Sequence, residues 1–142
     1  MATLLGNDYL GWFETATAGT FAALKGQGTY DENRSQPDID TSSKDGAGYG
    51  TGAFGDIAWK GTIDIKVKLP DAVYSRIEAA SIAKTPIGFQ LRKGGAAAQT
   101  SDAVFAASVY VSVTNRTFNK DGTVDAKLAM ALAAAPTVDT LA

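Results

Sequence analysis

The sequence predicts a mainly β fold, a β-sandwich or open barrel with one α-helix and a long protruding glycine-rich loop. Three patterns lead to this fold class. Apolar and polar residues alternate along residues 57–69, a similar alternation lies on both sides of a turn within residues 103–134, and apolar residues between 71 and 84 recur at helical spacing. No internal repeat and no break in composition divides the chain, so residues 1–142 are predicted to form a single domain.

The N-terminal third contains the weaker strand patterns. The segments YLGWFE and TFAALK combine aromatic and apolar residues, and Gly19 lies between them at a position suited to a turn. Residues 30–36 are almost wholly polar on both faces, and Pro37 interrupts them. If this segment is a strand, we expect it at an edge or exposed to solvent, because proline cannot donate a hydrogen bond within a central ladder.

The middle of the chain predicts a long loop, a long strand and the helix. Residues 42–58 form the glycine-rich loop. The helix over residues 71–84 has Asp71 near its start and Pro86 just past its end. Between the loop and the helix, strict alternation predicts a strand with one buried face. The residues of that face are Ile57, Trp59, Gly61, Ile63, Ile65, Val67 and Leu69.

The last third predicts a short strand and a hairpin. Ile87, Phe89 and Leu91 alternate with other residues, and the linker GGAAAQTSD that follows is predicted to be flexible. Residues 103–134 then form two alternating strands around a turn at Asn119–Gly122. The alanine-rich segment KLAMALAAA has helical propensity, but its alternation and its hairpin partner favour a strand.

The composition excludes several classes of function. The chain has 142 residues with no cysteine and no histidine, which excludes a disulfide framework, thiolate metal sites and histidine base catalysis. Its net charge of -2 and pI near 5.0 provide no basic patch for tight nucleic-acid binding. The sequence has no apolar run long enough for a membrane span and no signal-peptide pattern, which predicts a soluble protein made in the cytoplasm.

The glycine-rich loop suggests a cofactor site only at first sight. Gly50, Gly52 and Gly55 have the G-x-G-x-x-G spacing of a dinucleotide fingerprint. In that fingerprint a strand precedes the glycines and a helix N-terminus binds the pyrophosphate, and the sequence predicts neither here. We therefore expect no cofactor. The loop carries two aromatic residues that we expect to be exposed, Tyr49 and Phe54. Either the loop becomes ordered when these residues contact a neighbouring subunit, or it is a disordered segment.

Two groups of oxygen-bearing side chains allow further hypotheses. Asp38 and Asp40 would share one face of a strand, about 7 Å apart, as a glycosidase pair requires. Asn119, Asp121 and Asp125 match part of a calcium loop, although a hairpin turn explains them without an ion. Such groups are common on solvated strands and turns, so neither a catalytic nor a metal site is predicted.

The order of these features resembles that of the tail tube (major tail) proteins of long-tailed bacteriophages and related phage-like particles. The similarity begins in LKGQGTYDENRSQPDIDTSSKD, where a strand pair leads into a D-[IV]-[TS]-[TS]-K type segment at Asp38–Lys44. A long variable loop follows, then a strand with an aromatic residue, Trp59, near its start. The helix, the strand GFQLR and a final hairpin that runs into Pro136 and Thr137 complete the family's order. The resemblance spans nearly the whole chain.

The resemblance implies a non-enzymatic structural protein without a cofactor. In this family, β-sandwich subunits join into hexameric rings, and the rings stack into a tube whose lumen conducts DNA from the capsid to the host. The implied location is the virion tail, assembled in the cytoplasm of a bacterial host. The implied partners are further copies of the chain, tail tip, tape measure and terminator proteins, and DNA that passes without specific binding. No membrane is implied.

Two sets of candidate site residues follow from the loop and from the polar strand faces. The candidates for contacts between rings are Lys44, Asp45, Tyr49, Phe54, Asp56 and Trp59. The candidates for the lumen are Thr62, Asp64, Ser108, Ser112 and Asp125. A lining of mixed or acidic polar groups would let DNA slide, whereas a basic lining would bind the polyanion.

Two alternatives remain open at the level of sequence. The tube of a contractile secretion apparatus shares the fold and differs in what passes through the lumen. A monomeric carbohydrate-binding β-sandwich would instead use a stacking platform made of Trp12, Tyr49, Phe54 and Trp59.

Overall fold

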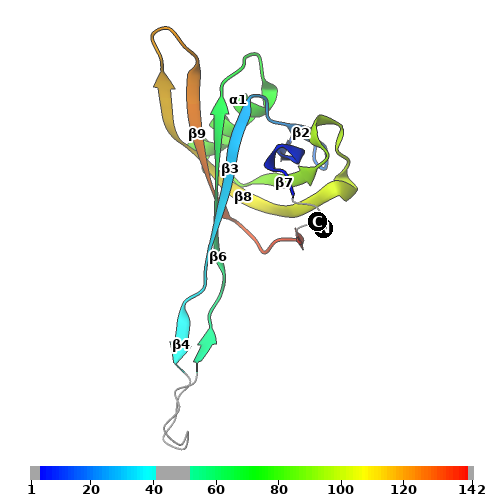
Figure 1. Ribbon diagram of the computed structural model, residues 1–142, viewed down its shortest axis with the longest axis vertical. Helices are drawn as coiled ribbons and strands as arrows, with labels where there is room; N and C mark the ends of the chain where they lie inside the picture. Colours follow the sequence, from blue (N-terminus) through cyan, green and yellow to red (C-terminus); the bar gives the residue numbers. More distant parts are fainter. Residues whose placement is uncertain (1–3, 41–51, 141–142) are drawn as a thin grey trace, which may run out of the picture.

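The structure of the chain is a computed structural model that describes residues 4–40 and 52–140. Its body is a curved β-sheet, and a narrow arm extends from it (Figure 1). The first strands are β1 (Tyr9–Glu14), β2 (Phe21–Ala23), β3 (Gln27–Ser35), β4 (Asp38–Asp40), β5 (Gly52–Phe54) and β6 (Ala58–Lys66). They are followed by α1 (Ala72–Ala83), β7 (Ile87–Lys93), β8 (Ala103–Phe118), β9 (Val124–Leu132) and β10 (Val138–Asp139). The 3-10 helices are η1 (Gly6–Asp8), η2 (Gly95–Ala97) and η3 (Thr100–Asp102).

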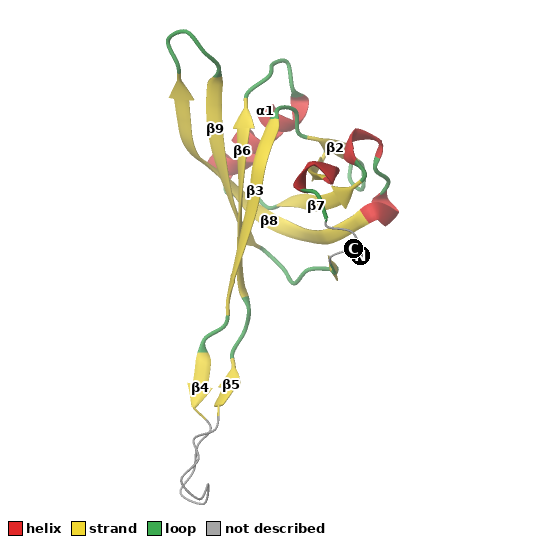
Figure 2. Cartoon of the chain, viewed as in Figure 1, coloured by secondary structure: helices red, strands yellow, loops and turns green. Residues whose placement is uncertain are grey.

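The body is one antiparallel sheet of eight strands. Seven of them follow the order β2-β1-β7-β8-β9-β6-β3, and β10 pairs with β8. Strands β4 and β5 form a separate two-stranded sheet, which is the arm. Figure 2 shows the strands of the body, the arm at the lower end and α1 near the upper end. The predicted mainly β fold with one α-helix is confirmed, and the predicted edge strand over residues 30–36 lies in β3, at the end of the strand order.

A glutamine side chain joins the two sides of the curved sheet. Nε2 of Gln27, on β3, donates to the carbonyl oxygens of Gly11 and Leu24, each at 2.8 Å, and its Oε1 accepts from the Gly11 amide at 2.8 Å. A Cβ atom at residue 11 would lie 3.1 Å from Phe89 Cε1, so glycine at this position lets the backbone of β1 lie close to the Phe89 ring. The sheet is therefore an open barrel whose gap between β1 and β3 is bridged by one amide.

Replacement of Gln27 by leucine should lower the free energy of unfolding by about 2–4 kcal/mol. The variant removes the partner of the Gly11 amide and of the Leu24 carbonyl in a partly buried position, and each such group costs about 1–3 kcal/mol. The Gly11 carbonyl still accepts from the Leu24 amide at 3.3 Å. Urea denaturation measures the loss. Gln27→Glu keeps an acceptor for the Gly11 amide but places a carboxylate oxygen against the Gly11 and Leu24 carbonyls, so its loss should be at least as large as that of Gln27→Leu. Wild-type stability of Gln27→Leu would show that the amide does not hold the barrel closed.

One apolar cluster fills the barrel. Phe89 lies at its centre, with its ring centroid 5.1 Å from that of Phe13 and 6.1 Å from that of Phe105. Helix α1 packs against β8 and contributes Ile77, which is fully buried. The largest fully buried side chains are Phe13, Phe89, Ile63, Ile77, Leu128 and Val109.

Helix α1 has well-defined caps at both ends, which explains why its position could be predicted from the sequence. The Asp71 carboxylate accepts hydrogen bonds from the Val73 amide at 3.0 Å and from the Lys25 amide at 3.1 Å, so it caps the helix and ties it to the chain before β3. Lys84 ends the helix in the left-handed conformation, with a φ of 58°. Within the described ranges, no helix is long and apolar enough to cross a membrane.

The structure differs from the sequence predictions in three segments. The linker GGAAAQTSD is ordered as η2 and η3, and Gln99 and Asp102 form a capping box, with 2.8 Å between the Gln99 amide and Asp102 Oδ2. Residues 52–54, predicted as loop, form β5 because they pair with β4. The strand predicted over residues 57–69 ends at Lys66.

Candidate functional site

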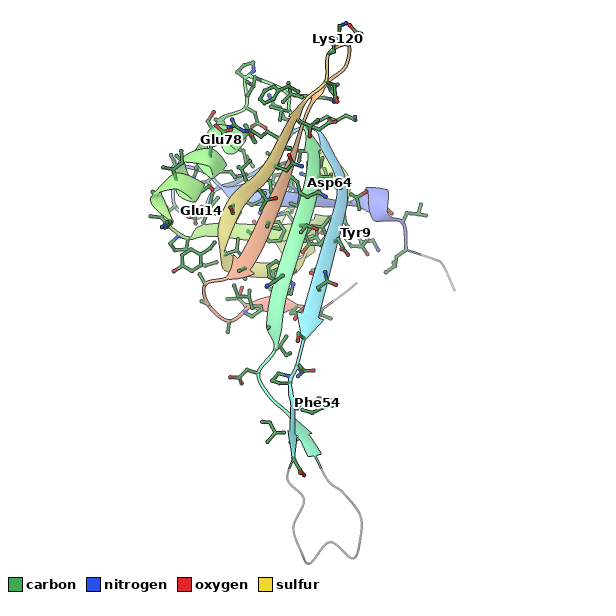
Figure 3. The ribbon with its side chains drawn as sticks, turned by 90° about the vertical axis from the view of Figure 1, so that its left-hand side faces the viewer. Tyr9, Glu14, Phe54, Asp64, Glu78 and Lys120 are labelled. Atoms are coloured by element: carbon green, nitrogen blue, oxygen red, sulfur yellow. The ribbon has the colours of Figure 1, made fainter. Side chains whose placement is uncertain are left out.

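The outer face of β6, β9 and β8 carries all the residues predicted to line a lumen. Their alternate neighbours Ile63, Ile65 and Leu128 are buried, so these polar side chains point outward. The residues are Thr62, Asp64, Ser108, Ser112 and Asp125. Thr62 lies opposite Ala129, which lies opposite Ser112. We call this surface, which includes Lys66 and Lys127, the mixed polar face; Figure 3 shows Asp64 on it.

Opposite charges alternate across the mixed polar face. Lys127 Nζ lies 3.8 Å from Asp64 Oδ1, and Lys66 Nζ lies 3.6 Å from Asp125 Oδ1. In each pair the two residues are direct cross-strand neighbours, which favours opposite charges. The pairs are solvent-exposed and therefore contribute little to stability. The two ion pairs make the surface polar and leave no net charge at these four residues.

Asp125 also organises the turn between β8 and β9. Thr123 Oγ1 donates to Asp125 Oδ1 at 2.9 Å, and Asn119 Nδ2 donates to Asp125 Oδ2 at 3.1 Å. These hydrogen bonds, led by that of Thr123, and the charge of Lys66 lower the pKa of Asp125. Asn119 and Thr123 thus hold the Asp125 carboxylate within the turn. In the described part of the chain, no group of three or more His, Cys, Asp or Glu side chains could hold a metal.

Two strand edges of the body are candidates for pairing with other copies. Strand β3 ends the strand order and pairs with β6. Strand β8 has 16 residues, whereas β7 has 7 and stops pairing at Val109. Beyond Val109, β8 continues along β9, and its other edge meets α1 where the Val113 amide donates to Ser81 Oγ at 3.4 Å. This second edge is not among the sequence predictions, although the unequal lengths of β7 and β8 are a signal for it.

The arm exposes apolar side chains. Strand β4 pairs with β5, and the register places Asp38 opposite Phe54 and Ile39 opposite Ala53. Phe54 is 71% exposed, Ile39 is also exposed, and Asp56 lies in solvent after β5. Exposed large apolar groups on a narrow projection are typical of a contact surface. The predicted contact residues Lys44, Asp45 and Tyr49 lie outside the described residues.

Trp59 is a core residue, which corrects its assignment as a loop contact. Its side chain is 4% exposed and stacks on Phe105, with 4.7 Å between the ring centroids. Its Nε1 donates to Glu32 Oε2 at 3.0 Å, and the same oxygen accepts from the Tyr30 hydroxyl at 2.9 Å. Burial and then Glu32 raise the pKa of Tyr30. Trp59 lies on the inward face of β6, where a large aromatic is buried with its N–H satisfied.

The predicted carbohydrate platform is also wrong. Trp12 lies under Arg92, whose guanidinium carbon is 4.4 Å from the ring centroid, on the outer side of β1 and β7. Trp59 is in the core and Phe54 is on the arm, so these three rings do not share a surface. The glycosidase pair lies on the same arm, where Asp38 and Asp40 are exposed to solvent on β4. That position offers no enclosed site for a sugar.

Comparison with known proteins identifies the fold. No protein-family model and no curated protein matches the chain. A tail subunit of an empty gene transfer agent particle, refined with C6 symmetry, matches with a TM-score of 0.74 and 15% identity over 97% of this chain and 100% of that one. The SPP1 tail tube matches with a TM-score of 0.68 and 15% identity over 98% of this chain and 81% of that one. A structure of the anti-feeding prophage baseplate matches with a TM-score of 0.63 and 4% identity over 99% of each chain.

The chain therefore has the fold of phage-type tail tube proteins, as the sequence predicted. In particular, it is similar over nearly its full length to a chain of a native gene transfer agent virion and to that of the SPP1 tail tube.

Proposed function

We propose that this chain is the structural subunit of a phage-type tail tube, and that it acts without catalysis. Hexameric rings of the chain stack into a tube, and DNA passes from the capsid to the host through its lumen. The observation that carries this proposal is the match of almost the entire chain to a complete tail subunit, at a TM-score of 0.74. The tube belongs to the virion tail, is assembled in the bacterial cytoplasm, and contacts tail tip, tape measure and terminator proteins.

Ring closure uses the two edges of the body. The strands β3, β6, β9 and the second half of β8 form a continuous four-strand segment with β3 at one side and β8 at the other. Pairing of β3 of one subunit with the part of β8 beyond Val113 of the next subunit satisfies unpaired strand edges, because the Val113 amide already donates to Ser81 of α1. Because the two edges differ, the contact is head-to-tail, and a constant rotation between subunits closes it into a ring.

The mixed polar face lines the lumen in this arrangement. Joined edges would make the outer faces of β6, β9 and β8 continuous around the ring. The ion pairs Asp64–Lys127 and Asp125–Lys66 place a carboxylate beside two of the ammonium groups on this surface. A lining of this kind does not accumulate the positive charge that binds phosphates through counterion release, so DNA can slide along it.

The arm makes the contact between rings. It projects from the body along the long axis of the molecule (Figure 1) and carries Phe54 and Asp56. Burial of Phe54 against the next ring removes an exposed aromatic surface from water, which favours stacking. Lys44, Asp45 and Tyr49, in the segment that joins β4 to β5, are assigned to the same contact.

A second candidate is the tube subunit of a contractile secretion apparatus. The match to an anti-feeding prophage baseplate structure, at a TM-score of 0.63, favours keeping it. The neighbouring genes distinguish the two functions: capsid and terminase genes accompany a phage tail, whereas a contractile secretion apparatus has sheath and baseplate genes without them.

Purified full-length chain at high concentration should form rings or tubes in negative-stain electron microscopy. Six-fold ring averages would support hexamers, and tubes filled with stain would support an open lumen. Analytical ultracentrifugation gives the matching mass in solution. A chain that stays monomeric at every concentration, even with tail tip proteins added, contradicts the proposal.

A further inference from the structure

An apolar groove lies at the end of the body opposite to the arm. It has a volume of about 450 Å³ and lies between α1, the segment after β6 and the hairpin of β8 and β9. Leu69 and Phe118 line it and are 69% and 71% exposed, and Val67 and Val124 lie beside them. Large apolar side chains gathered around a hollow are a docking surface for an apolar group. We call this surface the upper groove.

The arm has a shape and charge that fit the upper groove. Asp38 and Phe54 are opposite each other in the register and therefore share one face of the arm, while Ile39 lies on the other face. The described arm residues, 36–40 and 52–57, include Asp38, Asp40 and Asp56 and no lysine or arginine. The face that carries Phe54 thus combines one exposed aromatic ring with adjacent carboxylate groups.

The rim of the upper groove carries two cations and one carboxylate. Arg116 and Glu78 both line the groove, and Arg116 Nη1 lies 3.9 Å from Glu78 Oε1. A guanidinium group has five N–H donors, so this single long contact leaves donors for a second carboxylate. Lys68, between the lining residues Val67 and Leu69, adds a second exposed cation nearby. An acidic arm is therefore a better occupant than a basic one.

The two complementary surfaces cannot meet within one chain. Figure 3 shows Phe54 on the arm, Glu78 of the upper groove at the far end of the body, and Lys120 on the hairpin beyond it. Contact between them requires a second copy of the chain. Because donor and acceptor lie at opposite ends of the long axis, each added copy leaves the same two surfaces free, and the contact repeats in one direction.

We propose that the upper groove of one copy binds the Phe54 face of the arm of a second copy. Phe54 lies between Leu69 and Phe118 of the acceptor, and Asp38 pairs with Arg116. This inference rests on the proposed tube function and goes beyond it by naming the surface that receives the arm.

The absence of cysteine makes disulfide trapping a direct test. The double variant Gly52→Cys with Ser75→Cys places one thiol on the Phe54 face of the arm and the other in the upper groove, and it keeps Phe54, Asp38 and Phe118. After assembly and mild oxidation, we expect a ladder of covalent multimers on a non-reducing gel, removed by dithiothreitol. Each single variant should give at most a dimer.

A matched control uses the same helix. Gly52→Cys with Ile82→Cys places the second thiol two turns further along α1, about 10 Å away, on another exposed residue. It should give no ladder. If tubes of the first variant form without a ladder, or if both variants cross-link equally, the groove is not the acceptor although the tube function stands. If the wild-type chain forms neither rings nor tubes, the proposed function is contradicted and this inference with it.

Discussion

A chain in which a two-residue Asn-Gly turn replaces residues 36–57 is expected to fold and form rings but to lose tubes entirely. Ser35 and Ala58 are direct partners at the end of the ladder of β3 and β6, so a two-residue hairpin turn fits between them. The described residues of the removed segment, 36–40 and 52–57, include the separate sheet of β4 and β5 and contribute no member of the apolar core. The fold should therefore keep its thermal unfolding temperature, while the contact between rings is removed.

Electron microscopy and sedimentation measure this effect together. Phe54→Ser should weaken stacking in the same direction, by a factor of about ten or more in the concentration needed for tubes, because a buried phenylalanine contributes about 1.5–3 kcal/mol. Ile39→Ser changes an exposed apolar residue on the other face of the arm and should have a smaller effect. Tubes of normal length from the shortened chain would mean that another surface joins the rings.

The sequence predicted the elements that have one buried and one exposed face. In β6 and β9, alternation determines which side chains enter the core, so a period of two identifies both the strand and its inward residues. The same pattern placed Thr62 and Ser112 on the polar faces of their strands, and the pairing of both with Ala129 brings them onto one outer face. Helix α1 was located with similar accuracy because its cap, Asp71, is a local signal.

Features that depend on distant contacts could not be predicted in this way. The bridge from Gln27 to Gly11 joins residues 16 positions apart across the gap of the barrel, and no local pattern marks a glutamine for that role. Trp59 illustrates the opposite error. Its place near a glycine-rich loop favoured an exposed contact. Its position in β6, where it shares the inward face with Gly61, Ile63 and Ile65, was the better guide to its burial.

The arm was predicted in part. Glycine content and exposed aromatics indicated a protruding segment with a surface role, but β4 and β5 were assigned to loop or to a solvated strand. The pairing of β3 with β6 brings the two following segments together, but with a shift of one residue: Ser35 is opposite Ala58, whereas Asp38 is opposite Phe54 and not Gly55. Strand pairing of this kind depends on the partner more than on the segment's own composition.

Gly26→Ala is expected to cause the largest loss of stability among single substitutions in the turn before β3, about 3–5 kcal/mol. Gly26 has a φ of +74°, and a Cβ atom there would lie 2.0 Å from the carbonyl oxygen of Lys66. The left-handed conformation costs an alanine about 1–2 kcal/mol, and the displaced backbone of β6 adds the rest. The Lys66 amide also donates to the Gly26 carbonyl at 2.8 Å, and this hydrogen bond cannot be kept while the strands separate.

Gly19→Ala separates the two causes. Gly19 has a φ of +81°, but a Cβ atom there meets nothing within 4 Å, so only the conformational cost of about 1–2 kcal/mol applies. Urea denaturation of both variants should therefore show a difference of at least about 2 kcal/mol, which is the steric contribution of Lys66. Equal losses would mean that the end of β6 moves at no cost. Because β3 is also the edge that we assign to ring closure, Gly26→Ala should impair ring formation in proportion to its loss of stability, whereas Gly19→Ala should assemble normally.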